Sequence, residues 1–194
     1  RSVSAFLLNR SSDLAIRVAK FEKVSFGQFK KDWLKTFPAW QSEPDEDYMD
    51  KVIWNVWQDI TLPKRGTVDS AGYDFYCPCE LIIKPGQTLV IPTGIRCDID
   101  RNWVLSIYPR SGLGFKYGIR LANSVGIIDG DYFFADNEGH IFVKIVNDSP
   151  FAVPLTLDKG KAFCQGVFTP YGITYDDDVQ DKRTGGLGST DSNK

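Results

Sequence analysis

Residues 140–147 read HIFVKIVN, and their alternation of apolar and polar side chains predicts a β-strand. Ile141, Val143 and Ile145 share one face of that strand, because successive side chains of an extended chain point to opposite faces. Other short β-rich runs occur around it: YDFYC, ELII, TLVIPTGI, WVLSIY and AFCQGVF. Turn signals such as Pro85-Gly86 recur between the runs, at the spacing of an all-β sandwich or barrel. We therefore predict a mainly β fold.

The first part of the chain carries different signals. Alternation over 14–21 predicts a strand. Ser25 and Gln28 have the spacing of a capping box for a helix that Pro38 ends. We predict that Ser42 and Asp45 cap a second helix. Its aromatic and aliphatic stripe is expected to pack against the body of the protein or to cover a subunit edge: Tyr48, Val52, Ile53, Val56, Trp57 and Ile60.

Composition excludes several classes of partner. The chain has 194 residues, a formal net charge of −2 and 42% hydrophobic residues, and its sequence pI is about 5.4. A nucleic-acid duplex and an anionic membrane are bound by strong positive fields, so we expect neither as a partner. Apolar runs are too short for a transmembrane helix. Any phosphate site must be local, built from a few arginines and backbone amides.

The cysteines and the single histidine restrict metal chemistry. Cys77 and Cys79 have one residue between them, where zinc knuckles use two to four. With Cys97 and Cys164, they are expected to be buried free thiols of a reducing compartment, the cytoplasm. Any histidine triad or zinc site would have to use His140.

The stretch NSVGIIDGDY (123–132) carries the clearest candidate for chemistry. We predict a tight hairpin in which Asp129 and Asp131 point the same way, with Gly130 free to take a positive φ. A carboxylate there, next to the ring of Tyr132, is a plausible general base.

Three glycine-containing segments are weak signals alone: SAGYDF (70–75), PRSGLG (109–114) and RTGGLGST (183–190). The last is neither a Walker A loop nor a Rossmann fingerprint, because no lysine and no helix follow it. Together with NSVGIIDGDY and KAFCQGVFTPY, they occur in the order of the five motifs of one family. Across 61–191 the chain resembles the trimeric dUTP diphosphatase (dUTPase) family.

The resemblance implies a jelly-roll-like β-barrel that assembles as a homotrimer, with each active site built from three subunits. The implied reaction is attack of water on the α-phosphorus of dUTP, which yields dUMP and pyrophosphate. This activity keeps uracil out of DNA and supplies dUMP for thymidylate synthesis. Asp129 matches the family's base, and a positioned base contributes roughly 10²–10⁴-fold to rate. Asp74 matches the acid that reaches Mg²⁺ through water.

The resemblance also implies a substrate site. Arg110, Ser111, Gly112 and Gln165 match phosphate-binding positions, and Tyr132 matches the ring under the deoxyribose. Asn123, Gly126 and the neighbouring backbone would bind uracil by imitating the pairing edge of adenine. The tail would close over the site through a last set of residues: Arg183, Leu187, Gly188 and Ser189.

The chain departs from the family pattern in three places. Leu187 stands where a phenylalanine is usual, which removes an aromatic contact. FFADN (133–137) is a short insertion after the third motif, and the segment 14–60 exceeds the family minimum. The expected organisation is a leader (1–13) of unassigned role, a first strand with a helical addition (14–60), a barrel (61–178) and a closing tail (179–194).

Two alternatives remain open at this point. A dCTP deaminase has a related fold, but it uses a catalytic glutamate and a longer second motif. A regulatory binding protein with a nucleotide-gated tail is the other alternative, although such a protein does not need the base at Asp129.

Overall fold

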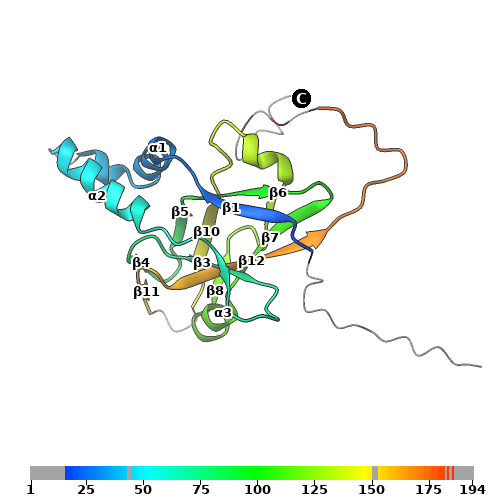
Figure 1. Cartoon of the computed structure of the whole chain (residues 1–194). Helices are drawn as coiled ribbons and strands as arrows, with labels where there is room; N and C mark the ends of the chain where they lie inside the picture. The colour runs from blue at the N-terminus through cyan, green and yellow to red at the C-terminus, as the bar shows by residue number, and fades with distance from the viewer. Residues whose placement is uncertain (1–15, 43–44, 150–152, 182, 184, 186–194) are drawn as a thin grey trace, which may run out of the picture.

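Five antiparallel strands form the largest sheet of the structure, a computed structural model that describes residues 16–42, 45–149, 153–181, 183 and 185. The longest pairing, between its two long central strands, runs from Cys164 opposite Pro109 to Pro170 opposite Trp103. Figure 1 shows the arrangement. In spatial order, the strands are β2 (Lys64–Arg65), β3 (Tyr73–Tyr76), β12 (Ala162–Pro170), β7 (Trp103–Pro109) and β9 (Gly126–Ile128).

Three smaller antiparallel sheets complete the β structure of the described residues. Ile141, which precedes β10, and Val143 and Ile145 within it are at most 3% exposed, so the alternation in HIFVKIVN is confirmed. The mainly β prediction is confirmed as well. The sheets are β5 (Thr88–Pro92) with β10 (Phe142–Asn147) and β8 (Ile119–Leu121), β1 (Ala19–Lys23) with β6 (Ile95–Ile99), and β4 (Leu81–Ile83) with β11 (Leu155–Leu157).

Two helices lie together on one side of the strands (Figure 1). They are α1 (Phe26–Thr36) and α2 (Glu46–Gln58), joined by a chain that includes the 3-10 helix η1 (Pro38–Ser42). Phe29, Trp33 and Ile53 from these helices belong to the same buried cluster as the strands. Ile53 and Val56 of the predicted stripe are buried, as is Ile60 just beyond α2, so most of the stripe packs against the body of the protein, whereas Tyr48 is 61% exposed.

The capping prediction for α1 is half right. The Oγ atom of Ser25 accepts a hydrogen bond from the backbone N–H of Gln28 at 3.1 Å, as a capping box requires. The Gln28 side chain, however, donates to Asp32 instead of returning to Ser25. The backbone N–H of Ser25 donates to Glu138 at 2.7 Å, so a distant carboxylate replaces the local one.

Other boundaries differ from the expected ones. The first strand is Ala19–Lys23, whereas Ile16 to Val18 are not in a strand and Leu14 lies outside the described residues. Asp45 alone caps α2, with its Oδ1 atom accepting from Tyr48 N at 2.8 Å, and Ser42 belongs to η1. Two short helices were not expected: α3 (Ser111–Tyr117) and the 3-10 helix η2 (Gly130–Phe134).

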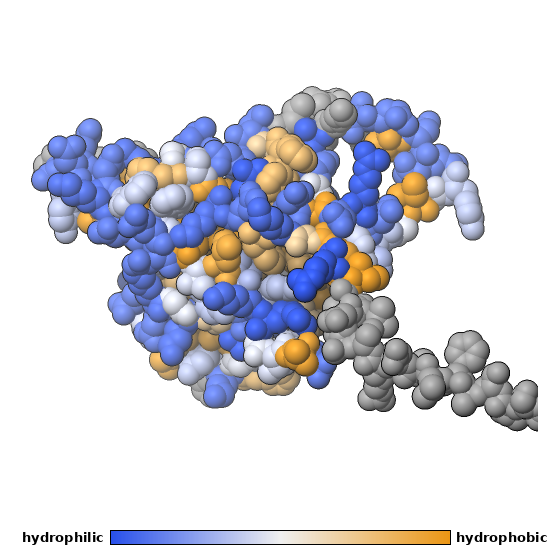
Figure 2. Space-filling view, viewed as in Figure 1, coloured by the Kyte–Doolittle hydropathy of each residue, from blue (hydrophilic) through white to orange (hydrophobic). Residues whose placement is uncertain are grey.

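The surface in Figure 2 is largely hydrophilic, with apolar patches that include one over η2, where Phe134 is 75% exposed. Cys77, Cys97 and Cys164 are buried, Cys79 is half-buried, and all four are free thiols. None of the described helices combines the length and the apolar character that crossing a bilayer requires.

Candidate active site

Asp74, Gln165 and Tyr108 lie side by side on three neighbouring strands. Gln165 on β12 is paired with Asp74 on β3 and with Tyr108 on β7. Its Nε2 atom donates to the carbonyl oxygen of Pro109 at 3.3 Å. A Cβ atom at Gly72 would lie 2.5 Å from Oε1 of Gln165. The glycine of the first motif therefore makes room for the glutamine of the fourth.

Arg110 adds the second motif to this cluster. Its Nη1 atom lies 3.4 Å from Oδ2 of Asp74. Arg110 is the N-cap of α3 and SGLG forms its first turn, in which Ser111 and Gly112 are exposed. Backbone N–H groups in a first helical turn have no acceptor within the helix, so they can donate to a ligand.

The third motif begins with a tight turn between β8 and β9. Ser124 has a φ of 64°, which is uncommon for a residue other than glycine. Val125 N donates to the carbonyl oxygen of the exposed Asn123 at 2.7 Å. A Cβ atom at Gly126 would lie 3.2 Å from Cβ of Ile107, so the glycine allows β9 to approach β7. Among the described strands, β9 is one of the two edge strands of its sheet, so the edge of β9 that faces away from β7 is unpaired.

Asp129 and Asp131 both contact the guanidinium group of Arg183. The Nη2 atom of Arg183 lies 2.9 Å from Oδ2 of Asp129, and its Nε atom lies 3.0 Å from Oδ1 of Asp131. The Asp129 side chain is 50% exposed and that of Arg183 is 17% exposed. An arginine has five N–H donors, so the remaining ones can bind phosphate oxygens.

The predicted hairpin at Asp129 is wrong in detail. Gly130 is not among the described residues with a positive φ, and the chain enters η2 immediately after Asp129. Positive φ values occur instead at Glu138 and Gly139, 57° and 69°. The chain reversal thus lies downstream of Asp131.

Tyr132 is 5% exposed, and hydrogen bonds hold its phenol group. The hydroxyl donates to the carbonyl oxygen of His140 at 2.7 Å and accepts from Nδ2 of Asn137 at 2.8 Å. Burial raises the pKa of the phenol, so it stays a protonated donor. The Cζ atom of Arg183 lies 5.5 Å from the centre of the ring. The arginine therefore lies next to both the candidate base and the candidate sugar-binding ring.

The structure brings the candidate residues together in two groups, not one. Because Ile128 pairs with Leu105, Asp129 lies beside Val104, whereas Arg110 follows the other end of β7. The extended strand between 104 and 110 spans roughly 20 Å. Figure 1 shows α3 at the bottom and the yellow-green η2 near the top. We call the groups the Asp74 group (Asp74, Arg110, Ser111, Gly112 and Gln165) and the Asp129 group (Asp129, Tyr132 and Arg183). Gly126 pairs with Ile107, midway along β7, and Asn123 lies beside Gly126, so these two residues lie between the groups.

The remaining tail residues predicted for the site lie outside the described residues: Leu187, Gly188 and Ser189. The leader predicted over 1–13 also lies outside them. The contact that the described part of the tail does make, through Arg183, is with the third motif of the same chain.

The acidic residue of the Asp74 group fits a loosely held magnesium ion. Its side chain is 19% exposed and lies next to a guanidinium group. Over the described ranges, no cluster of three or more His, Cys, Asp or Glu side chains could hold a metal ion. A single carboxylate suits an ion that keeps several waters and takes other ligands from substrate phosphates, as Mg²⁺ does.

Sequence reasoning missed several residues that surround the Asp129 group. Asp131 was noted without a role, Asn137 was noted only as part of the insertion, and Glu138 and Asp32 were given no role. His140 was recognised only as the single histidine. A lone histidine at the start of an apolar strand was the one available signal, and its partner Asp32 lies 108 positions away along the chain.

Comparisons with known proteins agree with the motifs. The dUTPase family model matches residues 58–192. The deoxyuridine 5'-triphosphate nucleotidohydrolase of Lactococcus lactis subsp. lactis is 42% identical, over 68% of this chain and 88% of that protein. The enzyme of the same name from Bordetella pertussis is 39% identical, over 66% of this chain and 87% of that protein.

Solved structures with the same fold include the dUTPase of Streptococcus mutans, with a TM-score of 0.53 and 38% identity over 58% of this chain and 88% of that chain. A dUTPase mutant from phage phi11 of S. aureus, whose structure holds a structural Mg(II) ion, has a TM-score of 0.52 at 19% identity, over 62% of this chain and 90% of that chain. The second match supports the fold alone. Because the family model matches most of the chain and both nucleotidohydrolases are at least 39% identical to it, the chain belongs to the dUTPase family.

Proposed function

We propose that this chain hydrolyses dUTP to dUMP and pyrophosphate. The observation that carries the proposal is the Asp129 group, in which an exposed carboxylate, a guanidinium group and an anchored aromatic ring meet on the third motif. These supply a base, a phosphate ligand and a sugar-binding surface. The family membership agrees with the same substrate, because both relatives described above are dUTP nucleotidohydrolases. For that reason the deaminase alternative is not favoured.

Asp129 is the proposed base. Its carboxylate accepts a proton from a water molecule, and the resulting hydroxide attacks the α-phosphorus of dUTP. Half of its side-chain surface is exposed, so water can reach it. The bond between the α-phosphorus and the bridging oxygen breaks, and pyrophosphate leaves with the charge that Arg183 and Arg110 stabilise.

The Asp74 group is the proposed phosphate site. Arg110 contributes charge, Ser111 and Gly112 contribute hydroxyl and backbone donors, and Gln165 contributes an amide. Asp74 would contact a Mg²⁺ ion through water, and this ion, when bound, offsets part of the triphosphate charge. Leu187, Gly188 and Ser189 of the tail would then cover the phosphates and exclude water.

Uracil selection is assigned to the strand edge of the third motif. The unpaired edge of β9 offers backbone donors and acceptors next to Asn123 and Gly126. A site built to hydrogen-bond one base rejects another that leaves buried polar groups unpaired, by about 10⁴–10⁵ in favourable cases. The ring of Tyr132 would lie under the deoxyribose and crowd out a ribose 2′-hydroxyl.

A homotrimer with a jelly-roll-like barrel fold is the proposed assembly. The Asp74 and Asp129 groups lie at opposite ends of β7, so a complete site requires residues from more than one subunit. Phe115 and Ile127 are 93% and 57% exposed, which suits residues that a neighbouring subunit covers. Residues 61–178 would form the barrel, 14–60 the helical addition and 179–194 the closing tail. Four free thiols suit the cytoplasm.

An assay of pyrophosphate release across dUTP and the four common deoxynucleotides tests this proposal. We expect release from dUTP alone, and Asp129→Asn should retain nucleotide binding with at least a hundredfold loss of kcat, roughly the lower end of a general base's contribution. Ammonia released from dCTP would overturn the assignment. An Asp129→Asn variant with half of the normal turnover would refute the role of the base.

A further inference from the structure

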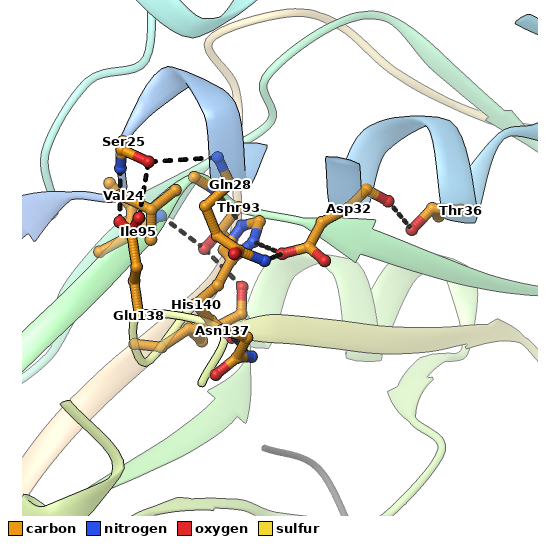
Figure 3. Close-up of polar contacts among 12 residues, drawn as sticks. Val24, Ser25, Gln28, Asp32, Thr36, Thr93, Ile95, Asn137, Glu138 and His140 are labelled. Carbon is orange, nitrogen blue, oxygen red and sulfur yellow. Dashed lines mark hydrogen bonds and ion pairs between the residues drawn. The ribbon is translucent and has the colours of Figure 1, made fainter. Parts of the chain in front are cut away.

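The helical addition reaches the Asp129 group through His140. This side chain is fully buried, and its two ring nitrogens have different partners. Nε2 lies 2.8 Å from the backbone nitrogen of Gly94, and Nδ1 lies 2.6 Å from Oδ2 of Asp32 on α1. Figure 3 shows the contact between His140 and Asp32, with α1 above the segment that contains His140.

These partners fix the protonation pattern of the ring. A backbone N–H can only donate, so Nε2 must be the unprotonated acceptor toward Gly94. Nδ1 then carries the proton and donates it to the carboxylate of Asp32. Gln28 donates to the same carboxylate at 2.7 Å, which holds Asp32 in place.

The backbone of His140 in turn holds Tyr132. Its carbonyl oxygen accepts from the Tyr132 hydroxyl, and Asn137 bonds to both of these groups. Two hydrogen bonds, joined through the covalent structure of His140, therefore connect Asp32 on α1 to the ring that lies under Arg183.

A second contact ties the start of α1 to Glu138, the residue that follows the insertion. Both carboxylate oxygens of Glu138 bind Ser25, one to its backbone N–H at 2.7 Å and one to its hydroxyl at 2.6 Å. A carboxylate at a helix N-terminus is favourable, because it binds an otherwise unpaired N–H group and faces the positive end of the helix dipole. Figure 3 shows Ser25 at the start of α1, with the Glu138 carboxylate directed toward it. The segment 129–140 is thus held at two points by α1, which lies outside the residues that the family model matches.

We propose that α1 sets the position of the Tyr132 ring, with Asp32 as a positioning residue that acts through His140. This inference rests on the proposed role of Tyr132 in sugar selection. A misplacement of about 1 Å at a reacting site can cost 10²-fold in rate, so an anchor of this kind affects discrimination. If the ring moves, the space that excludes a 2′-hydroxyl widens, and UTP becomes a better substrate relative to dUTP.

The test measures kcat/KM for dUTP and for UTP with the full chain. Asp32→Ala removes the acceptor of Nδ1–H, and Tyr132→Phe removes the hydroxyl link while keeping the ring. We expect each to lower the preference for dUTP over UTP by about tenfold or more. Asp32→Asn keeps an acceptor oxygen, so its ratio of kcat/KM for dUTP to kcat/KM for UTP should stay within about threefold of the wild-type ratio. Partial unfolding of a variant lowers the measured kcat/KM for dUTP and for UTP by the same factor. The ratio of the two values therefore remains informative for a destabilised variant.

Val56→Ala is the matched control, because Val56 is buried on α2 but has no part in the hydrogen-bond network. It should destabilise the helical addition and leave the ratio unchanged. Tyr132→Leu separates the two proposals. If it lowers the ratio while Asp32→Ala and Tyr132→Phe do not, the positioning role is overturned and the sugar-binding role stands. If Tyr132→Leu leaves the ratio unchanged, both roles are overturned.

A spectroscopic measurement checks the network without activity. The chain contains one histidine, so ¹⁵N NMR of histidine-labelled protein reports on His140 alone. We expect a protonated Nδ1 and an unprotonated Nε2 in the wild type. Loss of this single tautomer in Asp32→Ala would support the network, and a protonated Nε2 in the wild type would overturn it.

Discussion

The Nη2 atom of Arg183 lies 2.9 Å from Oδ2 of Asp129, so the C-terminal tail contacts the proposed base within one chain. Asp131 holds the same guanidinium group at 3.0 Å. The pair of carboxylates therefore holds a cation next to the proposed base. Because both carboxylates are half exposed, the contact contributes more to the site's geometry than to stability.

Arg183→Gln should lower kcat for dUTP by about 10²–10³-fold, because it removes a charged donor aimed at the leaving group. The fold should keep its stability within about 1 kcal/mol, since exposed ion pairs contribute little. Steady-state pyrophosphate release and chemical denaturation measure the two quantities. Arg101→Gln, at an exposed position without a proposed role, is the control. Equal kcat for the two variants would refute the role of Arg183.

Truncation after Asp178 should leave folding and assembly intact and reduce kcat by at least about 10²-fold, because the tail contributes closure and no core. Light scattering coupled to gel filtration gives the oligomeric state, and circular dichroism gives Tm. Dissociation of the truncated protein into monomers would show that the tail stabilises the assembly and is not simply a lid.

Leu187→Phe should lower KM for dUTP, because it restores the aromatic stacking usual in the family, worth about 0.5–1.5 kcal/mol. That free energy corresponds to roughly a two- to tenfold change in KM. Steady-state kinetics of the two proteins in parallel measure it. If both KM and kcat are unchanged, leucine and phenylalanine cover the base equally well and the explanation fails.

Alkaline pH should destabilise the fold through its buried thiols. Burial raises the pKa of Cys77 to about 12, whereas a thiol of an unfolded chain has a pKa of about 8.5. Stability from this group is therefore complete below about pH 8.5 and falls as the pH rises toward 12, by about 1.4 kcal/mol per pH unit. Between pH 8 and pH 10 the wild type should lose about 2 kcal/mol more unfolding free energy than Cys77→Ala. Urea denaturation measures both unfolding free energies. If the two proteins lose the same amount between pH 8 and pH 10, the assigned role of the Cys77 thiol is contradicted.

The sequence predicted the strands and motifs well because their signals are local. The alternation in HIFVKIVN and the order of the five motifs need only neighbouring residues. The contacts of α1 could not be predicted in the same way. Ser25 receives its carboxylate from Glu138, which is 113 positions away, so the nearby Gln28 was assigned to the role instead.

The position of Asp129 was predicted less well than its identity. An Asp-Gly-Asp sequence favours a turn with a positive φ at the glycine, but the positive φ values occur at Glu138 and Gly139 instead. Sequence order also could not show that Asp74 and Arg110 lie far from Asp129 within one chain. That separation follows from the pairing of β9 with the start of β7, where Ile128 faces Leu105.

Mixing two inactive variants tests most directly whether subunits share a site. Asp129→Asn and Arg110→Gln should each lack activity as homo-oligomers. When they are unfolded together and refolded at equal amounts, half of the sites receive an intact Asp129 and half of those receive an intact Arg110 from a neighbour. We predict recovery to about one quarter of wild-type activity, the value expected for random assembly of a symmetric oligomer. A mixture that stays as inactive as its two components would show that one chain supplies both groups, and would contradict the shared site.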